Sequence, residues 1–153
     1  MIDKFIENYS FLSNFYNYPV TYEGLTFQNS ESAFQAQKTD DLNIKKQFTN
    51  ISPNKAKKLG RQVNLIKEWE LIKDKVMYEV CKAKFSDSQL MKKLLATGEE
   101  TLIEGNTWHD NYWGDCTCQK CEHIKGKNHL GKILMTLRKE FKTSNKEGEY
   151  FDD

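Results

Sequence analysis

The sequence predicts an α+β fold: a single compact, mostly helical domain with a small antiparallel sheet. Apolar residues recur at helical spacing in several segments between residues 29 and 141, whereas residues 19–27 alternate as two short strands would. A chain of 153 residues is long enough to bury roughly two thirds of its unfolded surface in one core. We place the domain at residues 1–142 and expect a polar, disordered tail over residues 143–153.

The first 28 residues carry the strand signals. Residues 19–27 alternate around Glu23 and Gly24, which favours a hairpin with a two-residue turn. Residues 11–16 are rich in aromatic side chains and are interrupted by a serine and an asparagine that can turn the chain. This loop is interpreted either as a ligand wall or as a plug in the core. The substrate contacts that we predict here are Phe11, Asn14 and Tyr16.

A short helix over residues 29–38 is the most informative segment of the chain. Asn29 or Ser30 can cap its amino terminus. Glu31, Gln35 and Lys38 then stand at positions i, i+4 and i+7 on one face, between alanine and phenylalanine residues. A solvated helix face is the alternative interpretation. We predict a pocket edge in which Glu31 and Lys38 are catalytic and Gln35 contacts the substrate.

The remaining elements follow in order. We expect a short polar helix over residues 40–49, a helix over 53–59 capped by Ser52, the longest helix over about 66–85, a helix from Asp87 to Gly98, a strand over 101–104 and a last helix that Asn128 caps. Arg61 follows the second of these helices and either caps its carbonyl groups or grips a phosphate. Lys84 ends the longest helix. We predict a substrate contact there, and Lys84 is also the reserve candidate for the catalytic amine of Lys38. Glu104 ends the strand, where we predict a substrate contact.

Residues 108–115 combine two tryptophans, a tyrosine and polar side chains. Trp113 offers a face on which a flat ring can stack, and the carboxylate of Asp110 can stabilise a developing positive charge. A tryptophan packed in the core, with Asp110 as a cap, is the alternative. Downstream, the glycine-flanked turn with Lys127 and Asn128 opens the last helix, whose backbone N–H groups can receive a phosphate.

Three of the four cysteines are crowded into residues 116–121. Thiolate and imidazole ligands suit zinc, yet four ligands within eight residues lack the separated pairs of common zinc sites. We therefore expect reduced thiols and no cofactor. The alternative is a zinc site formed by Cys116, Cys118, Cys121 and His123, in which His109 can serve as a replacement ligand.

Composition limits the partners of the protein. Lys and Arg number 23 against 22 Asp and Glu, so a net charge of +1 gives no global attraction to nucleic acid. Residues 1–10 lack the basic start and apolar run of a signal peptide, and no stretch approaches the ~20 apolar residues that span a bilayer. We expect a cytoplasmic protein with no membrane partner.

Several of these segments, taken together, resemble the NADAR or YbiA-like family. They run in the order of that family over residues 5–141. The matching segments are residues 11–15, Glu31 with 34–38, 56–61, Trp69, 84–85, 94–98, 102–104, Asp110 with 113–114, 126–135 and Arg138. The stretch from Cys116 to His123 departs from the simpler members.

The resemblance implies a hydrolase of N-glycosidic bonds between ribose and a base or amine. Members include enzymes that remove ADP-ribose from modified guanine in nucleic acid and hydrolases of phosphoribosylamino-pyrimidine intermediates of riboflavin synthesis. A non-catalytic ADP-ribose reader is a further alternative. Two routes fit the residues: Glu31 activates water while Asp110 stabilises an oxocarbenium ion, or the amine of Lys38 forms a Schiff base with the opened sugar.

Overall fold

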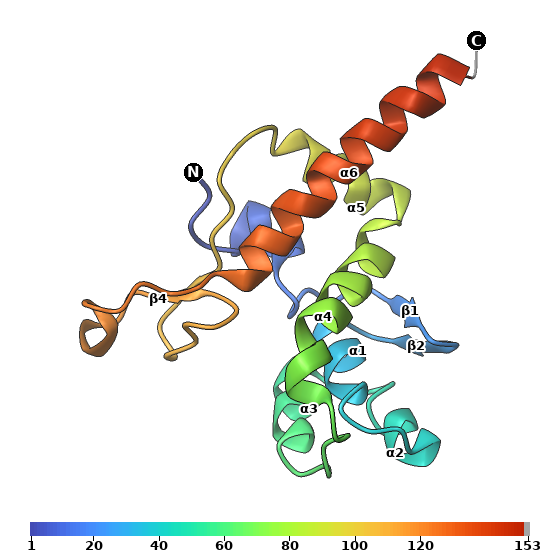
Figure 1. Cartoon of the computed structure of the whole chain (residues 1–153), viewed down its shortest axis with the longest axis vertical. Helices are drawn as coiled ribbons and strands as arrows, with labels where there is room; N and C mark the ends of the chain where they lie inside the picture. Colours follow the sequence, from blue (N-terminus) through green and yellow to red (C-terminus); the bar gives the residue numbers. More distant parts are fainter. Residues whose placement is uncertain (152–153) are drawn as a thin grey trace. The chain divides into compact units, whose positions relative to one another are not determined.

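The computed structural model describes the backbone of residues 1–151 and the side chains of residues 1–145. Helices make up most of its regular structure and the strands are short, so the predicted α+β class is confirmed (Figure 1). The chain divides into two compact units. One unit holds residues 13–84, and the other holds residues 1–12 together with the chain from Phe85 onward.

The hairpin of the first unit forms as its alternation predicts. Strands β1 (Val20–Tyr22) and β2 (Leu25–Phe27) pair antiparallel, with Val20 opposite Phe27. Glu23 and Gly24 both have positive φ angles, 52° and 82°, as a tight two-residue turn of this kind requires. Glycine adopts such an angle without steric cost, whereas Glu23 does so only because the turn imposes it.

Helix α1 (Ser30–Ala36) is buried along its whole length. It begins at Asn29, whose side chain accepts a hydrogen bond from the backbone N–H of Ser32 at 2.8 Å. It lies against α3 (Pro53–Gly60), α2 (Leu42–Lys46) and the hairpin (Figure 1). These contacts exclude water from α1, so its polar side chains lie inside the unit.

The long helix α4 (Trp69–Phe85) starts later than expected, because residues 67–68 form a turn before it. Its first residue, Trp69, packs its ring 5.2 Å from the ring of Phe34 in α1. The cap at Ser52 forms as predicted and accepts a hydrogen bond from Lys55 N at 3.2 Å. Local capping signals therefore place the helix starts around α1.

The second unit is built on α5 (Ser88–Ala96) and α6 (His129–Phe151), which pack together through buried leucines, and on the short helix η1 (Glu7–Leu12). Helix α6 runs through residues 143–151, where a polar tail was expected, and residues 152–153 lie outside the described part of the chain. Among the described helices, none combines the length and apolar composition needed to cross a membrane.

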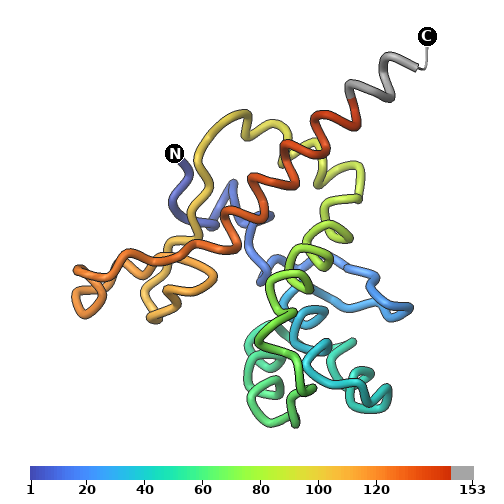
Figure 2. Tube along the Cα trace, viewed as in Figure 1, coloured from blue at the N-terminus to red at the C-terminus, as the bar shows by residue number. Residues whose placement is uncertain are grey.

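The predicted strand over residues 101–104 is wrong in its position. Leu102 makes only one parallel bridge, to Ile2, so a ladder does not develop there. The pairing lies further along, where β3 (Gly105–Asn106) runs parallel to β4 (Asp115–Cys116). Figure 2 traces the chain from β3 through the short helix η2 (Gln119–Cys121) to the start of α6, in gold to orange.

Candidate functional site

Glu31 is a buried carboxylate in the first turn of α1, with only 8% of its surface exposed. Gln35, one turn later, donates from Nε2 to Oε1 of Glu31 at 3.3 Å. Among the described residues, Oε1 of Gln35 accepts no hydrogen bond, and it lies against Gly60 of α3. The helical spacing predicted for this pair is therefore present, and it lies inside the unit rather than on a solvated face.

Asn14 fixes the start of α1 from the preceding loop. Its carbonyl oxygen accepts from the backbone N–H of Glu31 at 3.0 Å, and its Oδ1 accepts from Ser30 Oγ at 2.9 Å. Its Nδ2 also lies 3.4 Å from the sulfur of Met77 in α4. We predicted Asn14 as a substrate contact, and the structure uses its polar atoms to hold Glu31 in place.

Lys38 lies just beyond α1, in a turn closed by its N–H bond to the carbonyl oxygen of Gln35 at 3.2 Å. The side chain is partly exposed. Burial lowers its pKa, the carboxylate of Glu31 opposes this shift, and the guanidinium of Arg61 adds to it. Glu31 and Gln35 therefore lie on α1, whereas Lys38 lies in the turn that follows the end of the helix at Ala36.

Lys84 is almost completely buried, with 2% of its surface exposed. Its Nζ donates to the carbonyl oxygen of Ser13 at 2.8 Å and lies 5.7 Å from the ring centre of Tyr16. Burial lowers its pKa from 10.5 to about 8, and Cys81 opposes the shift. This amine therefore holds the loop that carries Asn14 and Tyr16.

Cys81 belongs to the same neighbourhood, although its sequence pattern indicates only a core position. Burial raises its pKa to about 12, the charge of Lys84 opposes that shift, and the charge of Glu31 adds to it. Its Sγ lies 4.0 Å from Oδ1 of Asn14. No sequence signal distinguishes such a thiol from an ordinary buried cysteine, because its neighbours come from other elements.

The other predicted contacts in this unit lie nearer its surface. Tyr16 is partly buried and stacks on Tyr18 at 6.0 Å, with an angle of 12° between the rings. Arg61 is the carboxyl-terminal cap residue of α3, and its exposed side chain is near enough to Lys38 to affect the pKa of that lysine. Both side chains are accessible to a ligand.

In the second unit, Phe11 is part of the core. It is 5% exposed, and its ring packs edge-on against Phe85 at 6.4 Å. The amine of Lys93 lies 5.7 Å from the centre of the same ring. Of the two interpretations of this aromatic loop, the core plug describes Phe11.

Asp110 caps the turn that carries Trp113. Its Oδ1 accepts from the backbone N–H groups of Tyr112 at 3.1 Å and of Trp113 at 2.9 Å. Asn106 supports the same turn, because its Oδ1 accepts from Asp110 N at 3.1 Å and its Nδ2 donates to Asp110 O at 2.8 Å. Asn106 was missed, although an asparagine shortly before a turn is a typical capping signal.

The start of α6 does not offer its backbone N–H groups to a phosphate. The N–H groups of residues 127–130 all donate to carbonyl oxygens of residues 111–114, over 2.8 to 3.1 Å. The side chain of Asn128 is also engaged, because Oδ1 accepts from Glu104 N at 3.0 Å and Nδ2 donates to Leu102 O at 2.9 Å. The predicted phosphate cradle is therefore wrong, and these bonds join residues 102–104 to the Trp113 loop.

The rings of Tyr112 and His129 lie near Trp113. Tyr112 packs edge-on against it at 4.8 Å, and His129 lies 4.5 Å from Tyr112. Lys127 is exposed, with its Nζ 5.6 Å from the ring centre of Tyr112. Trp113 is partly buried, so one part of the indole is packed and another part is accessible.

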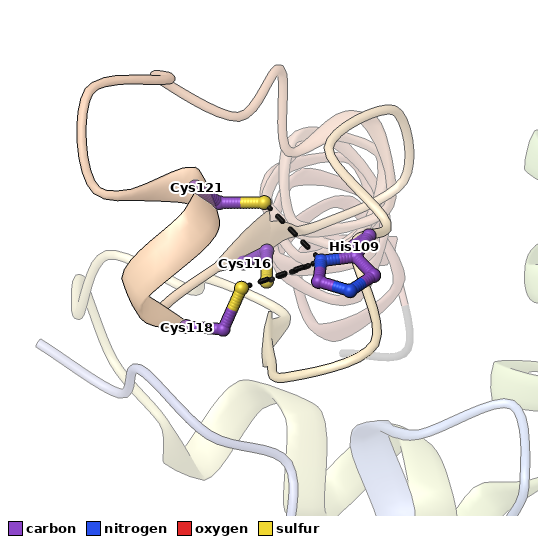
Figure 3. A group of neighbouring side chains, drawn as sticks. All are labelled: His109, Cys116, Cys118 and Cys121. Atoms are coloured by element: carbon purple, nitrogen blue, oxygen red, sulfur yellow. Dashed lines mark hydrogen bonds between the residues drawn. The ribbon is translucent and has the colours of Figure 1, made fainter.

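The thiols of residues 116–121 converge on a histidine, as Figure 3 shows. Nδ1 of His109 lies 3.9 Å from Cys116 Sγ, 3.3 Å from Cys118 Sγ and 3.4 Å from Cys121 Sγ. His123, the histidine first considered for this group, has an exposed side chain and lies beside Glu122. The histidine of the cluster is therefore His109.

The predicted site residues thus fall in two groups, one in each unit. Residues 13–84 hold Asn14, Tyr16, Glu31, Gln35, Lys38, Arg61 and Lys84. The other unit holds Phe11, Glu104, Asp110, Trp113, Lys127, Asn128 and the cysteine cluster. The groups that can carry acid, base or amine chemistry are concentrated around α1.

Comparison with known proteins identifies the family of the chain. The sequence profile of the NADAR domain matches residues 3–142. The chain belongs to the NADAR domain family. N-glycosidase YbiA of Escherichia coli strain K12 is 39% identical over 138 residues, which cover 88% of this chain and 82% of that protein.

Two further proteins are similar to this chain. The solution NMR structure of Escherichia coli YbiA matches with a TM-score of 0.80 and 36% identity, over 96% of this chain and 90% of that one. A riboflavin biosynthesis protein of Vibrio vulnificus is 34% identical over 138 residues, which are 88% of this chain but only 36% of that longer protein. The profile match therefore shows the family, and the structural match shows that the fold is that of Escherichia coli YbiA.

Proposed function

We propose that this protein is an N-glycosidase that removes ADP-ribose from ADP-ribosylated guanine in nucleic acid. One observation carries the proposal: a buried carboxylate, Glu31, shares its surroundings with two amines of lowered pKa, Lys38 and Lys84. Relatives that are 39% and 33% identical are named N-glycosidases, which supports hydrolysis of an N-glycosyl bond. These names do not state a substrate, so ADP-ribosylated guanine is our own assignment.

Cleavage of this bond needs a leaving nitrogen that gains a proton and an anomeric carbon that accepts a nucleophile. In the proposed route the ribose ring opens, and the neutral amine of Lys38 adds to the exposed carbon as the guanine amine leaves with a proton. Water then hydrolyses the resulting Schiff base, which releases ADP-ribose and restores the lysine. Glu31 supplies and removes the protons.

Lys38 fits the nucleophile better than Lys84 because a substrate must reach the attacking amine. Lys38 is partly exposed, and its lowered pKa raises the neutral fraction that can attack. Lys84 is 2% exposed and donates to Ser13 O. We therefore assign Lys84 as a positioning residue that holds the loop bearing Asn14, which in turn fixes the backbone of Glu31.

The remaining predicted residues have supporting roles in the proposal. In the unit that holds α1, Tyr16 offers a ring face for a base or an adenine, and Arg61 is an exposed cation suited to a phosphate group. In the other unit, Trp113 and Lys127 offer the same two kinds of contact. Asp110 enters as the cap of the turn that presents Trp113. A net charge of +1 means that contacts with a nucleic acid would be local.

A second candidate substrate is a phosphoribosylamino-pyrimidine of riboflavin synthesis. One observation favours it: a relative that is 34% identical is named a riboflavin biosynthesis protein. The bond is again an N-glycosyl bond to ribose, so the same carboxylate and amine would serve. The two substrates differ in the group beyond the ribose, which Arg61, in the same unit as Glu31 and Lys38, would contact.

The deciding experiment incubates the protein in parallel with guanine-ADP-ribosylated DNA and with the phosphoribosylamino-pyrimidine, and weighs the products. We expect free ADP-ribose and unmodified guanine from the first substrate. Release of ribose phosphate from the second substrate alone would replace our assignment with the riboflavin candidate. Binding of ADP-ribose without release from either substrate would identify a non-catalytic reader and overturn the proposal.

Trapping with borohydride tests the nucleophile separately. Reduction during turnover should leave a sugar adduct on the wild-type protein and on Lys84→Met, and none on Lys38→Ala. Lys92→Ala, at an exposed position of α5, is the matched control and should trap as the wild type does. Equal trapping on Lys38→Ala would remove Lys38 from the role.

A further inference from the structure

The group of His109, Cys116, Cys118 and Cys121 has the dimensions of a tetrahedral metal site. Its four donor atoms, one Nδ1 and three Sγ, all lie within 4.8 Å of one another. Zinc–sulfur and zinc–nitrogen bonds of about 2.3 and 2.0–2.1 Å give a sulfur-to-nitrogen edge of about 3.6 Å in a tetrahedron. The three edges here are 3.3, 3.4 and 3.9 Å, close to that length.

We propose that these four side chains bind one Zn²⁺ ion through three thiolates and one imidazole. Soft thiolate ligands favour zinc over calcium or magnesium, which prefer oxygen donors. Four protein ligands complete the tetrahedron, so no coordination position stays open for water or substrate. The site is therefore structural, and it is independent of the proposed glycosidase function.

Residues outside the cluster orient its ligands in the way that second-layer groups of metal sites do. The amide of Asn111 donates from Nδ2 to Cys121 Sγ at 3.4 Å and accepts from Cys116 N at 2.9 Å. Cys116 also lies in β4, paired with Asn106 of β3. One amide thus fixes two ligands, as is typical of built metal sites.

The fold explains why His109, rather than His123, is the histidine that lies beside the three cysteines. His109 comes from the turn between β3 and β4, and the parallel pairing of those strands returns the chain so that the cysteines face it. The ligands are then one histidine before the turn and three cysteines after it. His109 has a φ angle of 69°, uncommon for a residue with a side chain, and that angle belongs to the turn that carries the ligand.

Zinc at this position would hold the loop that carries Trp113. Asp110 and Trp113 lie between the first ligand, His109, and the second, Cys116. A closed tetrahedron fixes both ends of that segment, so the ion would restrain the turn that Asp110 caps. The ion would therefore stabilise the accessible indole without taking part in chemistry.

Metal analysis of the reduced protein tests the proposal. After equilibration with Zn²⁺ and removal of the excess, we expect one tightly held zinc per chain in the wild type. His123→Ala, which removes the exposed histidine of the same segment, should retain that zinc, whereas Cys118→Ser and His109→Ala should hold much less. Reduced wild-type protein without stoichiometric zinc would overturn the proposal, as would equal zinc content in all four proteins.

Cobalt substitution identifies the type of ligand in the wild-type protein, so this test does not depend on whether a variant folds. Co²⁺ added to the reduced wild-type protein should give the intense visible bands of a tetrahedral ion and the ultraviolet charge-transfer band of thiolate ligands. Zn²⁺ should abolish both as it displaces cobalt, and His123→Ala should give the wild-type spectrum. Weak bands typical of octahedral cobalt, with no thiolate band, would contradict the site.

Discussion

Gln35 Nε2 donates to Glu31 Oε1 over 3.3 Å, one turn apart inside a helix that is buried on all sides. A helix in this setting normally presents apolar side chains, because a buried carboxylate loses its hydration. The amide of Gln35 compensates part of that loss and fixes the orientation of the carboxylate. The pair is therefore the structural feature that best separates a site from an ordinary core helix.

Replacing Glu31 with glutamine should lower kcat, since the amide keeps the volume of the side chain but cannot exchange a proton. General acid–base catalysis contributes about a hundredfold to ten-thousandfold, and we expect a loss in that range. Steady-state kinetics on the substrate identified above measures it. Glu68→Gln, at an exposed position before α4, is the control. A kcat for Glu31→Gln equal to that of the wild type would exclude the carboxylate from proton transfer.

The buried amine of Lys84 should make stability depend on pH. Its pKa is 10.5 in its ordinary state and about 8 in the folded chain. Between these values the unfolded chain binds more protons, so the free energy of unfolding rises as the pH rises through this window. The rise from this group is on the order of 3 kcal/mol at most.

Urea unfolding at the two ends of that window measures the effect. Lys84→Met should lack this part of the rise with pH, because methionine does not titrate. Lys92→Met, which removes an exposed amine, should keep the wild-type slope. If the stability of Lys84→Met and that of the wild type change equally with pH, the pKa of Lys84 in the folded chain equals its ordinary value despite the burial of the amine.

Features that depend on neighbouring residues were predictable from the sequence, and those that depend on distant ones were not. The cap at Ser52 and the turn at Glu23 and Gly24 form as predicted, because each requires only a few adjacent residues. The sequence also placed Glu31 and Gln35 on one helix face correctly. It placed Lys38 on the same helix, although the chain turns after Ala36.

The cysteine cluster shows the limit most clearly. Proximity along the chain suggested His123, with His109 as a replacement ligand, and the strand pairing between residues 105–106 and 115–116 brings in His109. Phe11 likewise had two interpretations, and its burial against Phe85 is set by a residue far along the chain. Helical periodicity carries no information on such contacts.

Gly60 should be intolerant of a side chain because of Gln35. A methyl group at residue 60 would overlap Oε1 of Gln35 and lie 2.8 Å from its Cδ. Gly60→Ala should therefore displace the amide from Glu31, lower stability by about 1 to 3 kcal/mol and reduce activity. Chemical denaturation and steady-state kinetics measure the two effects.

A double-mutant cycle separates this clash from a general effect of alanine in α3. In a Gln35→Ala background the overlap is gone, so Gly60→Ala should cost much less than it does in the wild type. The coupling energy between the two positions is the quantity to report. Additive effects of the two substitutions would mean that Gln35 moves aside freely and does not fix Glu31.

Asp110 offers a last test, which distinguishes positioning from charge. Its Oδ1 accepts from the N–H groups of Tyr112 and Trp113, and an asparagine can accept both bonds with its own Oδ1. Asp110→Asn should therefore keep wild-type stability and most of the wild-type activity. Asp110→Ala should lose about 1 kcal/mol of stability and weaken substrate binding, seen as a raised KM, because the turn that presents Trp113 loosens. If Asp110→Asn folds normally but its kcat falls as far as that of Glu31→Gln, the negative charge of Asp110 acts on the sugar, and the oxocarbenium route gains over the lysine route.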